Sequence, residues 1–533
     1  MSIFLIALTN PLMFIGYHFV LFCFTFFSSL FVTNYLNFVK SKKLVFLTIR
    51  GILGCLWVSL ILQFKGLCAN SLDDMFLVID FRNDLFSQSL IFISTGLFLY
   101  FFTIMLNILS HTKLPFKYLL EIPNILLLLL VCVQLFLLAN DLIVFILTLE
   151  LITFIVLILL NISFFTERPS QLSLESAVKY FVFNGFSMGL LWLSVVGYFA
   201  IFKKLNLAGI TIYFTLFPEI TYIYGNTLIA LHFIFFFAYL IKLGSGPVHF
   251  WLPDVYEGAE TFITSLLVIL IAPILFIKFI MLLTIITTNQ SEHLTQILLV
   301  TIGTISVIVG TFSAFSQKKI KRFLAFAGLT HFGFMFICLN QLTIISFVGV
   351  VIYLIFYILM NIIFFSILLL MQRHTSTALI YFTQLRGLFI GNDLLLYLGL
   401  VTILSFAGLP PFAGFFSKAI VLYIIVSTNN FGILCFLLCA ILVNVYLYLR
   451  LIKISLFETF ETTRFLTSTS PISSSSFFIR LVPSHLNTAW TLPNQQLVGF
   501  LTILTIFLFS IILYLPTLIV LSTKAVELLI LSY

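Results

Sequence analysis

Charge is scarce along this 533-residue chain. Charged residues make up 8% of it, whereas ordinary soluble domains carry roughly 25%. Hydrophobic residues make up 62%, and the mean hydropathy is +1.23. Apolar runs of about 20 residues, the length that crosses a bilayer core, recur from one end of the chain to the other. The composition excludes a soluble globule and predicts an all-α, multi-pass (polytopic) membrane protein.

Motifs for metals, iron–sulphur clusters and nucleotides are also missing. The seven cysteines form no Cys-x-x-Cys pair and no Cys/His cluster with ligand spacing. The chain has no convincing GxGxxG or Walker pattern. We therefore expect no cofactor and no metal in this chain. Cys435 and Cys439 share a helix face, and we expect both to pack in the core as buried free thiols do.

Hydropathy divides the chain into about fourteen transmembrane spans. The expected spans are 11–38, 44–64, 85–110, 118–139, 141–163, 175–202, 226–249, 261–287, 295–316, 322–340, 343–371, 393–427, 430–455 and 498–522. The fourth and fifth meet at Ala139-Asn140-Asp141, which predicts a tight antiparallel pair. A Ser/Thr-rich stretch within 456–497 predicts an exposed linker or a partner contact.

The distribution of basic residues supports this count, because loops on the cytoplasmic or matrix side collect Lys and Arg. With fourteen spans, most basic residues fall in alternate loops on one face, among them the run from Lys318 to Arg322. The opposite face keeps few, among them Lys203 and Lys204. Membrane surface potential and insertion topology explain the net charge of +8, so we expect no nucleic-acid partner.

Several ionisable residues fall inside the expected spans, where a charge at mid-bilayer costs about 2.5–3.5 kcal/mol on insertion scales. These residues are Arg50, Glu150, Lys179, His232, Lys242, Lys278, His331 and Lys418. Arg50 lies close enough to a helix end to snorkel, and Lys179 suits either anchoring or function. His232 fits a core histidine. Glu150, Lys242 and Lys418 have no interface within reach, which favours a buried ionisable chain over static ion pairs.

Helix breaks adjoin two of these lysines. Gly244-Ser245-Gly246-Pro247 follows Lys242, and Gly408-Leu409-Pro410-Pro411 precedes Lys418. Proline frees backbone carbonyls, and non-helical backbone at membrane depth is tolerated only inside protein or beside a wet cavity. The breaks fall in the fourth member of helices 4–8 and of helices 9–13, which predicts a transport site on internal repeats.

A lysine at such a break suits proton handling. Burial disfavours the protonated amine and a neighbouring carboxylate favours it, so moving a partner can change its proton occupancy. Glu150 is the expected partner of Lys242.

Three stretches carry a resemblance to a known family: FWLPDVYEGAE at 250–260, KKIKRFLAFAGLTHFGF at 318–334 and LSFAGLPPFAGFFSK at 404–418. They resemble the antiporter-like subunits of respiratory complex I, most narrowly subunit 2, called subunit N in bacteria. Its sister subunits usually differ at Val255-Tyr256-Glu257-Gly258, and subunit 4 typically has a glutamate where Lys418 stands. The resemblance runs from about residue 118 to 455.

The resemblance implies two inverted five-helix repeats with broken seventh and twelfth helices. It also implies proton translocation coupled to quinone reduction in other membrane-arm subunits of a large hetero-oligomer, with phospholipids around it. The implied divisions are helices 1–3 at 1–117, the first repeat at 118–290, the second at 291–455, a loop at 456–497 and the last helix at 498–533.

By the same resemblance, Glu150 matches the helix-5 glutamate, Lys242 the helix-7 lysine and Lys418 the helix-12 lysine. His331 falls on a histidine that bridges the two halves. The family's helix-8 lysine belongs near residues 270–272, where this chain reads Leu-Ile-Ala. Lys278 is expected to substitute for it, although it lies about two turns later on another face. The alternative is an interrupted relay.

Two other functions stay open: a structural subunit that only joins its neighbours, and a free-standing cation/proton antiporter of the related multi-subunit type. The first residues, MSIFLIALTNPLMF, lack the marks of a signal or transit peptide. That favours synthesis in an organelle, hence the mitochondrial inner membrane, with a bacterial plasma membrane as the alternative.

Overall fold

The computed structural model describes residues 50–61, 85–109, 116–161, 170–207, 218–286, 292–375, 379–385 and 393–457, with scattered single positions outside these ranges. Within these ranges the protein is all-helical, and ten helical stretches are long and apolar enough to cross a membrane. The expected spans at 11–38 and 498–522, and the loop 456–497 beyond residue 457, lie largely outside the described residues.

The helices, in chain order, are α4 (Leu85–Leu109), α5 (Phe116–Leu138), α6 (Leu142–Leu160), α7 (Ser170–Phe202), α9 (Pro218–Leu243), α10 (Trp251–Gly258), α11 (Thr261–Leu266), η1 (Leu267–Ile271), α12 (Ala272–Ile286), α13 (Glu292–Ser316), α14 (Ile320–Leu339), α15 (Ile344–Thr375), η2 (Phe382–Leu385), α16 (Asp393–Ala407), α17 (Ala413–Ser427), α18 (Phe431–Ile452) and η3 (Lys453–Phe457). Most of these bounds lie within a few residues of the expected spans. The expected span 393–427 is divided into α16 and α17. The helix expected to reach residue 249 ends at Leu243 with α9, and α10 begins after the break.

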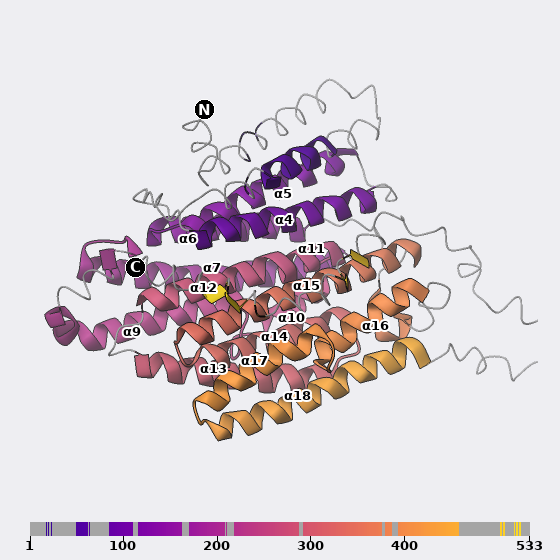
Figure 1. Cartoon of the computed structure of the whole chain (residues 1–533). Coiled ribbons are helices and arrows are strands. Elements are labelled where there is room, and N and C mark those ends of the chain that lie inside the picture. The colour runs from indigo at the N-terminus through magenta and orange to yellow at the C-terminus, as the bar shows by residue number, and fades with distance from the viewer. Residues whose placement is uncertain are drawn as a thin grey trace, which may run out of the picture.

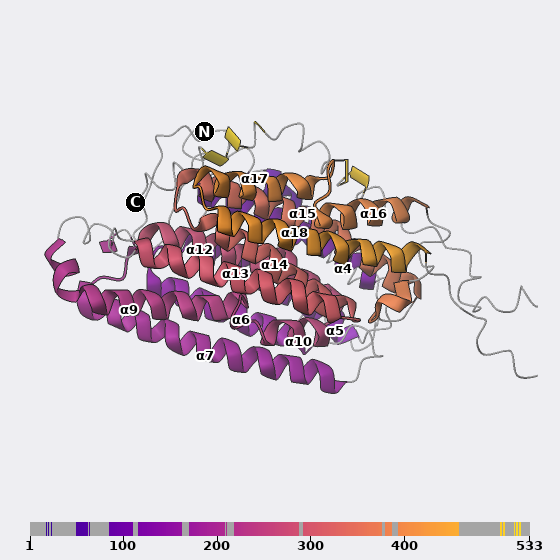
Figure 2. The ribbon, with the colours of Figure 1, turned by 90° about the horizontal axis from the view of Figure 1, so that it is seen from below.

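The helices lie roughly side by side along one direction (Figure 1), with α4, α5 and α6 at one edge and α18 at the opposite edge. Turning the molecule shows the long α7 and α9 together along another side (Figure 2). The short α10, which continues beyond the break after α9, packs against α7 and α14. The broken helices therefore contact neighbours on more than one side.

Backbone contacts between loops identify the two ends of the bundle. Asp141, in the tight α5–α6 turn, pairs with Asn206 just after α7. Lys319 pairs with Tyr381, and the Ile320 N–H donates to the Ile380 carbonyl at 2.9 Å. The two loop pairs lie at opposite ends of α7, whose 33 residues span about 50 Å.

Glycines let α13 and α14 approach closely. A Cβ added at Gly310 of α13 would lie 2.5 Å from Thr330 Cγ2 and 2.8 Å from the Phe326 carbonyl oxygen of α14. One added at Gly333 would lie 2.5 Å from Ser306 Oγ. Small residues at a helix–helix contact are a usual device in membranes, where van der Waals packing holds helices together.

The outward faces are apolar, as lipid contact requires. On α18, Leu442 is 71% exposed, and Cys435 and Cys439 are exposed as well. The expectation that these two cysteines pack in the core is therefore wrong. The physical reason is that lipid and core are equally apolar, so the hydrophobicity of a thiol does not distinguish the two faces of a helix at the edge of a bundle.

Candidate functional site

The first helix break separates α9 from α10. The chain leaves α9 at Gly244, whose φ of +65° suits glycine, and turns through Pro247 before α10 begins. The Trp251 indole N–H donates to the Ile241 carbonyl at 3.0 Å, and the Ser245 N–H donates to the Leu240 carbonyl at 3.3 Å. The break therefore satisfies these freed carbonyls without using Lys242.

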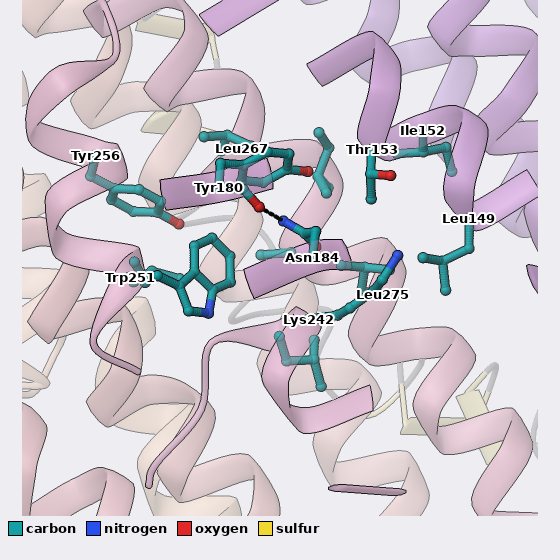
Figure 3. Close-up of a pocket in the computed structure, with 14 residues that line it drawn as sticks. Leu149, Ile152, Thr153, Tyr180, Asn184, Lys242, Trp251, Tyr256, Leu267 and Leu275 are labelled. Carbon is teal, nitrogen blue, oxygen red and sulfur yellow. Dashed lines mark hydrogen bonds between the residues drawn. The ribbon is translucent and has the colours of Figure 1, made fainter. Parts of the chain in front are cut away.

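The Lys242 amine lies in a cavity beside this break. The side chain is 4% exposed, and its Nζ has no hydrogen-bond partner among the described residues. The amine points toward Leu149 and Thr153 of α6 (Figure 3). The cavity has a volume of about 40 Å³, and a buried water needs roughly 10–15 Å³ of such space. There is therefore room for a few waters next to the Lys242 amine.

The cavity is built from α6, α7, the broken α9–α10 pair and the segment from η1 to α12. Its lining residues are Leu149, Ile152, Thr153, Tyr180, Asn184, Lys242, Leu243, Trp251, Leu252, Tyr256, Leu267, Ile271, Ala272 and Leu275. Glu150 lies at the edge of the α6 face that forms this wall. It is half-buried, and its charge is within electrostatic range of Lys242. No ion pair or hydrogen bond joins Glu150 to Lys242 among the described residues, so their pairing stays a prediction.

An apolar wall stands where the resemblance places a helix-8 lysine. Ile271 and Ala272 line the cavity, and the π-helical segment η1 runs from Leu267 to Ile271. Such π segments occur frequently at functional sites.

Lys278 lies one turn beyond the cavity wall and does not line the cavity. Its amine donates to the Ala139 carbonyl at 2.7 Å and to the Leu137 carbonyl at 3.3 Å. Both carbonyls belong to the C-terminal end of α5, where a cation is favoured by the unpaired carbonyls and the helix dipole. In this position Lys278 fastens α12 to the α5–α6 turn.

The second helix break separates α16 from α17, and there the lysine itself caps the broken end. Lys418 Nζ donates to the Ala407 carbonyl at 2.7 Å and to the Phe406 carbonyl at 3.0 Å. Gly408 has a φ of +79°, and a Cβ at this residue would lie 2.9 Å from the Lys418 Nζ. The positive φ favours glycine here, and an added Cβ would push against the end of the capping Lys418 side chain.

His331 of α14 lies beside the second break. Its Nδ1 is 2.9 Å from the Tyr353 hydroxyl, and its Nε2 has no hydrogen-bond partner in the described part of the chain. The His331 and Phe406 rings lie 5.8 Å apart, and Lys418 is within electrostatic range. His331 and Lys418 therefore form a second ionisable pair, as Glu150 and Lys242 form the first.

A group of ion pairs at the basic end of the bundle was not anticipated from the sequence. Asp254 of α10 lies 2.6 Å from both Lys179 of α7 and Arg322 of α14. Glu257, one turn later, pairs with Arg322 and Lys319. These contacts anchor Lys179 and tie α10 to both neighbours. The spacing of Asp254 and Glu257, three residues apart in WLPDVYEG, could have indicated one acidic helix face.

A buried histidine was also missed. His18 is within hydrogen-bond distance of Gln134 at 3.0 Å and of Ser59 at 3.1 Å. All three side chains are fully buried. His18 falls inside the expected span 11–38, and a histidine within an apolar span could have indicated a buried polar cluster. The cluster joins the N-terminal part of the chain to α5.

Two helices broken at membrane depth, each beside a buried lysine with a second ionisable group in range, define an antiporter-like membrane protein. The family described as NADH:quinone oxidoreductase/Mrp antiporter, TM matches residues 139–444, more than half of the chain. The chain belongs to this family.

Named relatives agree with this assignment. The chain is 28% identical over 280 residues to NADH-quinone oxidoreductase subunit N of Cytophaga hutchinsonii, covering 52% of this chain and 59% of that one. It is 28% identical over 364 residues to subunit N 1 of Rhizobium meliloti, covering 67% and 72%. It is 29% identical over 299 residues to NADH-ubiquinone oxidoreductase chain 2 of Marchantia polymorpha, covering 56% and 60%. The match spans less than two thirds of the first of these relatives.

Solved structures share the fold over nearly the whole chain. A chain of respiratory complex I from Thermus thermophilus gives a TM-score of 0.66 at 20% identity, covering 93% of this chain and 96% of that one. A chain of the Mrp complex from Dietzia gives 0.73 at 17% identity, covering 96% and 97%. At these identities the likeness shows the fold alone.

Proposed function

We propose that this chain is a proton-translocating, antiporter-like membrane-arm subunit of respiratory complex I, driven by quinone reduction in other subunits. One observation carries the proposal: the Lys242 amine has no hydrogen-bond partner among the described residues, lies in a cavity with room for water, and has Glu150 within electrostatic range. A static ion pair would have its nitrogen hydrogen-bonded. An amine left open to water can gain and lose a proton.

In this mechanism Glu150 controls the charge of Lys242. When the carboxylate is ionised and near, it favours the ammonium form of Lys242; when it is neutralised or drawn away, burial favours the neutral amine. The proton that Lys242 releases moves toward the second half, where His331 and Lys418 receive it. His331 offers its Nε2, which has no hydrogen-bond partner within the described ranges, and Lys418 is within electrostatic range at the second break.

The finer architecture belongs to the same proposal. The breaks after α9 and after α16 support two inverted five-helix repeats at 118–290 and 291–455. The family and the named relatives support assembly with other membrane subunits in a large complex, and we propose phospholipids as further partners. We propose the mitochondrial inner membrane as its location, with the basic loops facing the matrix. The relatives include a plant chain 2 as well as bacterial subunit N proteins.

The test measures protons translocated per NADH oxidised in proteoliposomes that contain the assembled complex. Lys242→Ala and Glu150→Gln are each expected to lower this ratio while the complex stays assembled. Gly189→Ala serves as the control, because a Cβ at this α7 position meets nothing within 4 Å. A fully assembled Lys242→Ala complex that pumps as the unaltered complex does would contradict the proposal and favour a purely structural subunit.

The Mrp-like fold keeps a cation/proton antiporter as the second candidate. The two are separated by purification: a complex I subunit co-purifies with a rotenone-sensitive NADH dehydrogenase, and an antiporter subunit does not.

A further inference from the structure

The two ionisable pairs need a connection between them, and the helix-8 position that the resemblance gives to a lysine is apolar here. Other groups that can pass a proton lie in the segments between the pairs. A tyrosine hydroxyl both donates and accepts hydrogen bonds, so it can take a proton on its oxygen while releasing its own. Buried tyrosines lie in this region on α10 and α15.

Tyr256 lies near the first ionisable pair, Glu150 and Lys242. It is 6% exposed and lines the cavity that holds the Lys242 amine. Its hydroxyl is turned inward, toward Trp251 (Figure 3). It stands on α10, which packs against α14, the helix that carries His331. Water in the cavity can therefore reach Tyr256 from Lys242.

Tyr357 lies near the second ionisable pair, His331 and Lys418. It is 2% exposed, and its ring lies 5.5 Å from the His331 ring. Its hydroxyl lies against Gly328, where an added Cβ would be only 3.2 Å from it. Gly328 is three residues before His331, so the two positions share one face of α14. The hydroxyl of Tyr357 is thus held on the side of α14 that presents His331.

Tyr357 stands on α15, which packs against η1, and η1 and Tyr256 both line the Lys242 cavity. Together these placements give an ordered series: cavity, Tyr256, Tyr357, His331 and then Lys418. We propose that Tyr256 and Tyr357 form a hydroxyl bridge that carries protons between the Lys242 and Lys418 half-sites, in place of a helix-8 lysine. The inference rests on the proposed function.

The transfer balances without ionising either tyrosine. The Lys242 ammonium gives a proton to cavity water, and water gives one to the Tyr256 oxygen, which releases its own toward Tyr357. Tyr357 passes a proton to His331 Nε2 in the same way. Each hydroxyl breaks one O–H bond as it forms another, so the charge moves and both tyrosines end neutral.

The test replaces each tyrosine by phenylalanine in the assembled complex. Tyr256→Phe and Tyr357→Phe are each expected to lower the protons translocated per NADH oxidised to the value of Lys242→Ala. The double variant is expected to be no worse than either single one, because the two hydroxyls act in series. Two independent packing defects would instead combine.

Tyr100→Phe is the matched control. Tyr100 is a buried tyrosine whose hydroxyl donates to the Ile362 carbonyl of α15 at 2.9 Å, outside both half-sites. Its loss is expected to lower stability and leave the proton ratio unchanged. Each bridge tyrosine tests the proposal separately, so failure of one variant to assemble still leaves the other.

The outcomes separate the bridge from the proposed function. Unchanged proton ratios in the tyrosine variants, together with a lowered ratio in Lys242→Ala, would overturn the bridge and leave the pumping role standing. Unchanged ratios in all of them would overturn both. A double variant with a greater loss than either single one would overturn the serial order.

Discussion

Lys242 and Lys418 resemble each other in sequence, since each adjoins a Gly/Pro break, but the structure holds them differently. Lys242 has no hydrogen-bond partner among the described residues, while Lys418 caps Phe406 and Ala407. The difference arises because Trp251 takes a freed carbonyl at the first break. Which group caps a break depends on the path of the turn, so a linear pattern cannot assign it.

Lys278 offers a test of two roles for one buried lysine. Lys278→Met removes the donor to two carbonyls at the end of α5, and each unsatisfied buried group costs about 1–3 kcal/mol. We expect a lower thermal stability of the complex and an unchanged proton ratio. Melting temperature and protons per NADH, measured on the same preparation, check this. A lowered ratio at unchanged stability would instead assign Lys278 to the relay.

The residues predicted from the sequence were those that are costly to bury. Glu150, Lys242 and Lys418 stand out because a charge inside an apolar run demands an explanation. Tyr357 carries no such signal, since one hydroxyl among aromatic residues fits an ordinary core. His18 was missed because its partners Ser59 and Gln134 lie 41 and 116 residues away, a pairing that only the folded chain reveals.

At the scale of the helices, the close approach of α13 and α14 depends on small residues at their contact. Gly303 and Gly333 face each other across the contact, Gly310 faces Thr330 and the Phe326 carbonyl, and α14 in turn carries His331. The position of His331 relative to Tyr357 and Lys418 therefore depends on how closely α13 supports α14.

Gly310→Ala is expected to separate these two helices. The added methyl would meet Thr330 and the Phe326 carbonyl, and overpacking of this kind costs about 1–3 kcal/mol. Gly189→Ala, which meets nothing within 4 Å, should be neutral or stabilising by up to about 1 kcal/mol, the gain in helix propensity. Melting temperatures of the two variants check this. Equal melting temperatures would show that α13 and α14 can move apart without loss of stability.

The positions of the helices along the chain were largely predictable from the sequence. The side of a helix that faces lipid, and local changes of helix type, were not. Apolar length determined most boundaries to within a few residues, and Gly/Pro content located both breaks. Hydropathy could not tell the lipid-facing side of α18 from its core-facing side, which is why Cys435 and Cys439 were placed wrongly. It also gave no warning of the π segment at Leu267–Ile271, because a local change of helical register leaves the apolar composition unchanged.

At the scale of the whole molecule, the two ends of the bundle differ in charge. The end that carries Lys318, Lys319 and Arg322 also holds the ion pairs of Asp254 and Glu257. The other end carries Lys203 and Lys204 beside the α5–α6 turn. Basic loops stay on the cytoplasmic or matrix side during insertion, so this asymmetry orients the molecule.

Labelling of single introduced cysteines tests this orientation. Lys318→Cys and Lys204→Cys occupy exposed positions at opposite ends. A membrane-impermeant maleimide should label position 318 only from the matrix or cytoplasmic side and position 204 only from the other. Mass spectrometry of the two peptides in sealed vesicles of each orientation reads this out. Labelling of both positions from one side would refute the assigned topology.

The Lys418 amine, which caps the helix end at the second break, determines how far the backbone must move during the proposed pumping cycle. A lysine ammonium has three N–H bonds and the neutral amine has two, and Phe406 and Ala407 use two. Lys418 can therefore discharge while both capping contacts persist. In the proposed pumping cycle, the helix ends at this joint therefore need not unfold and refold.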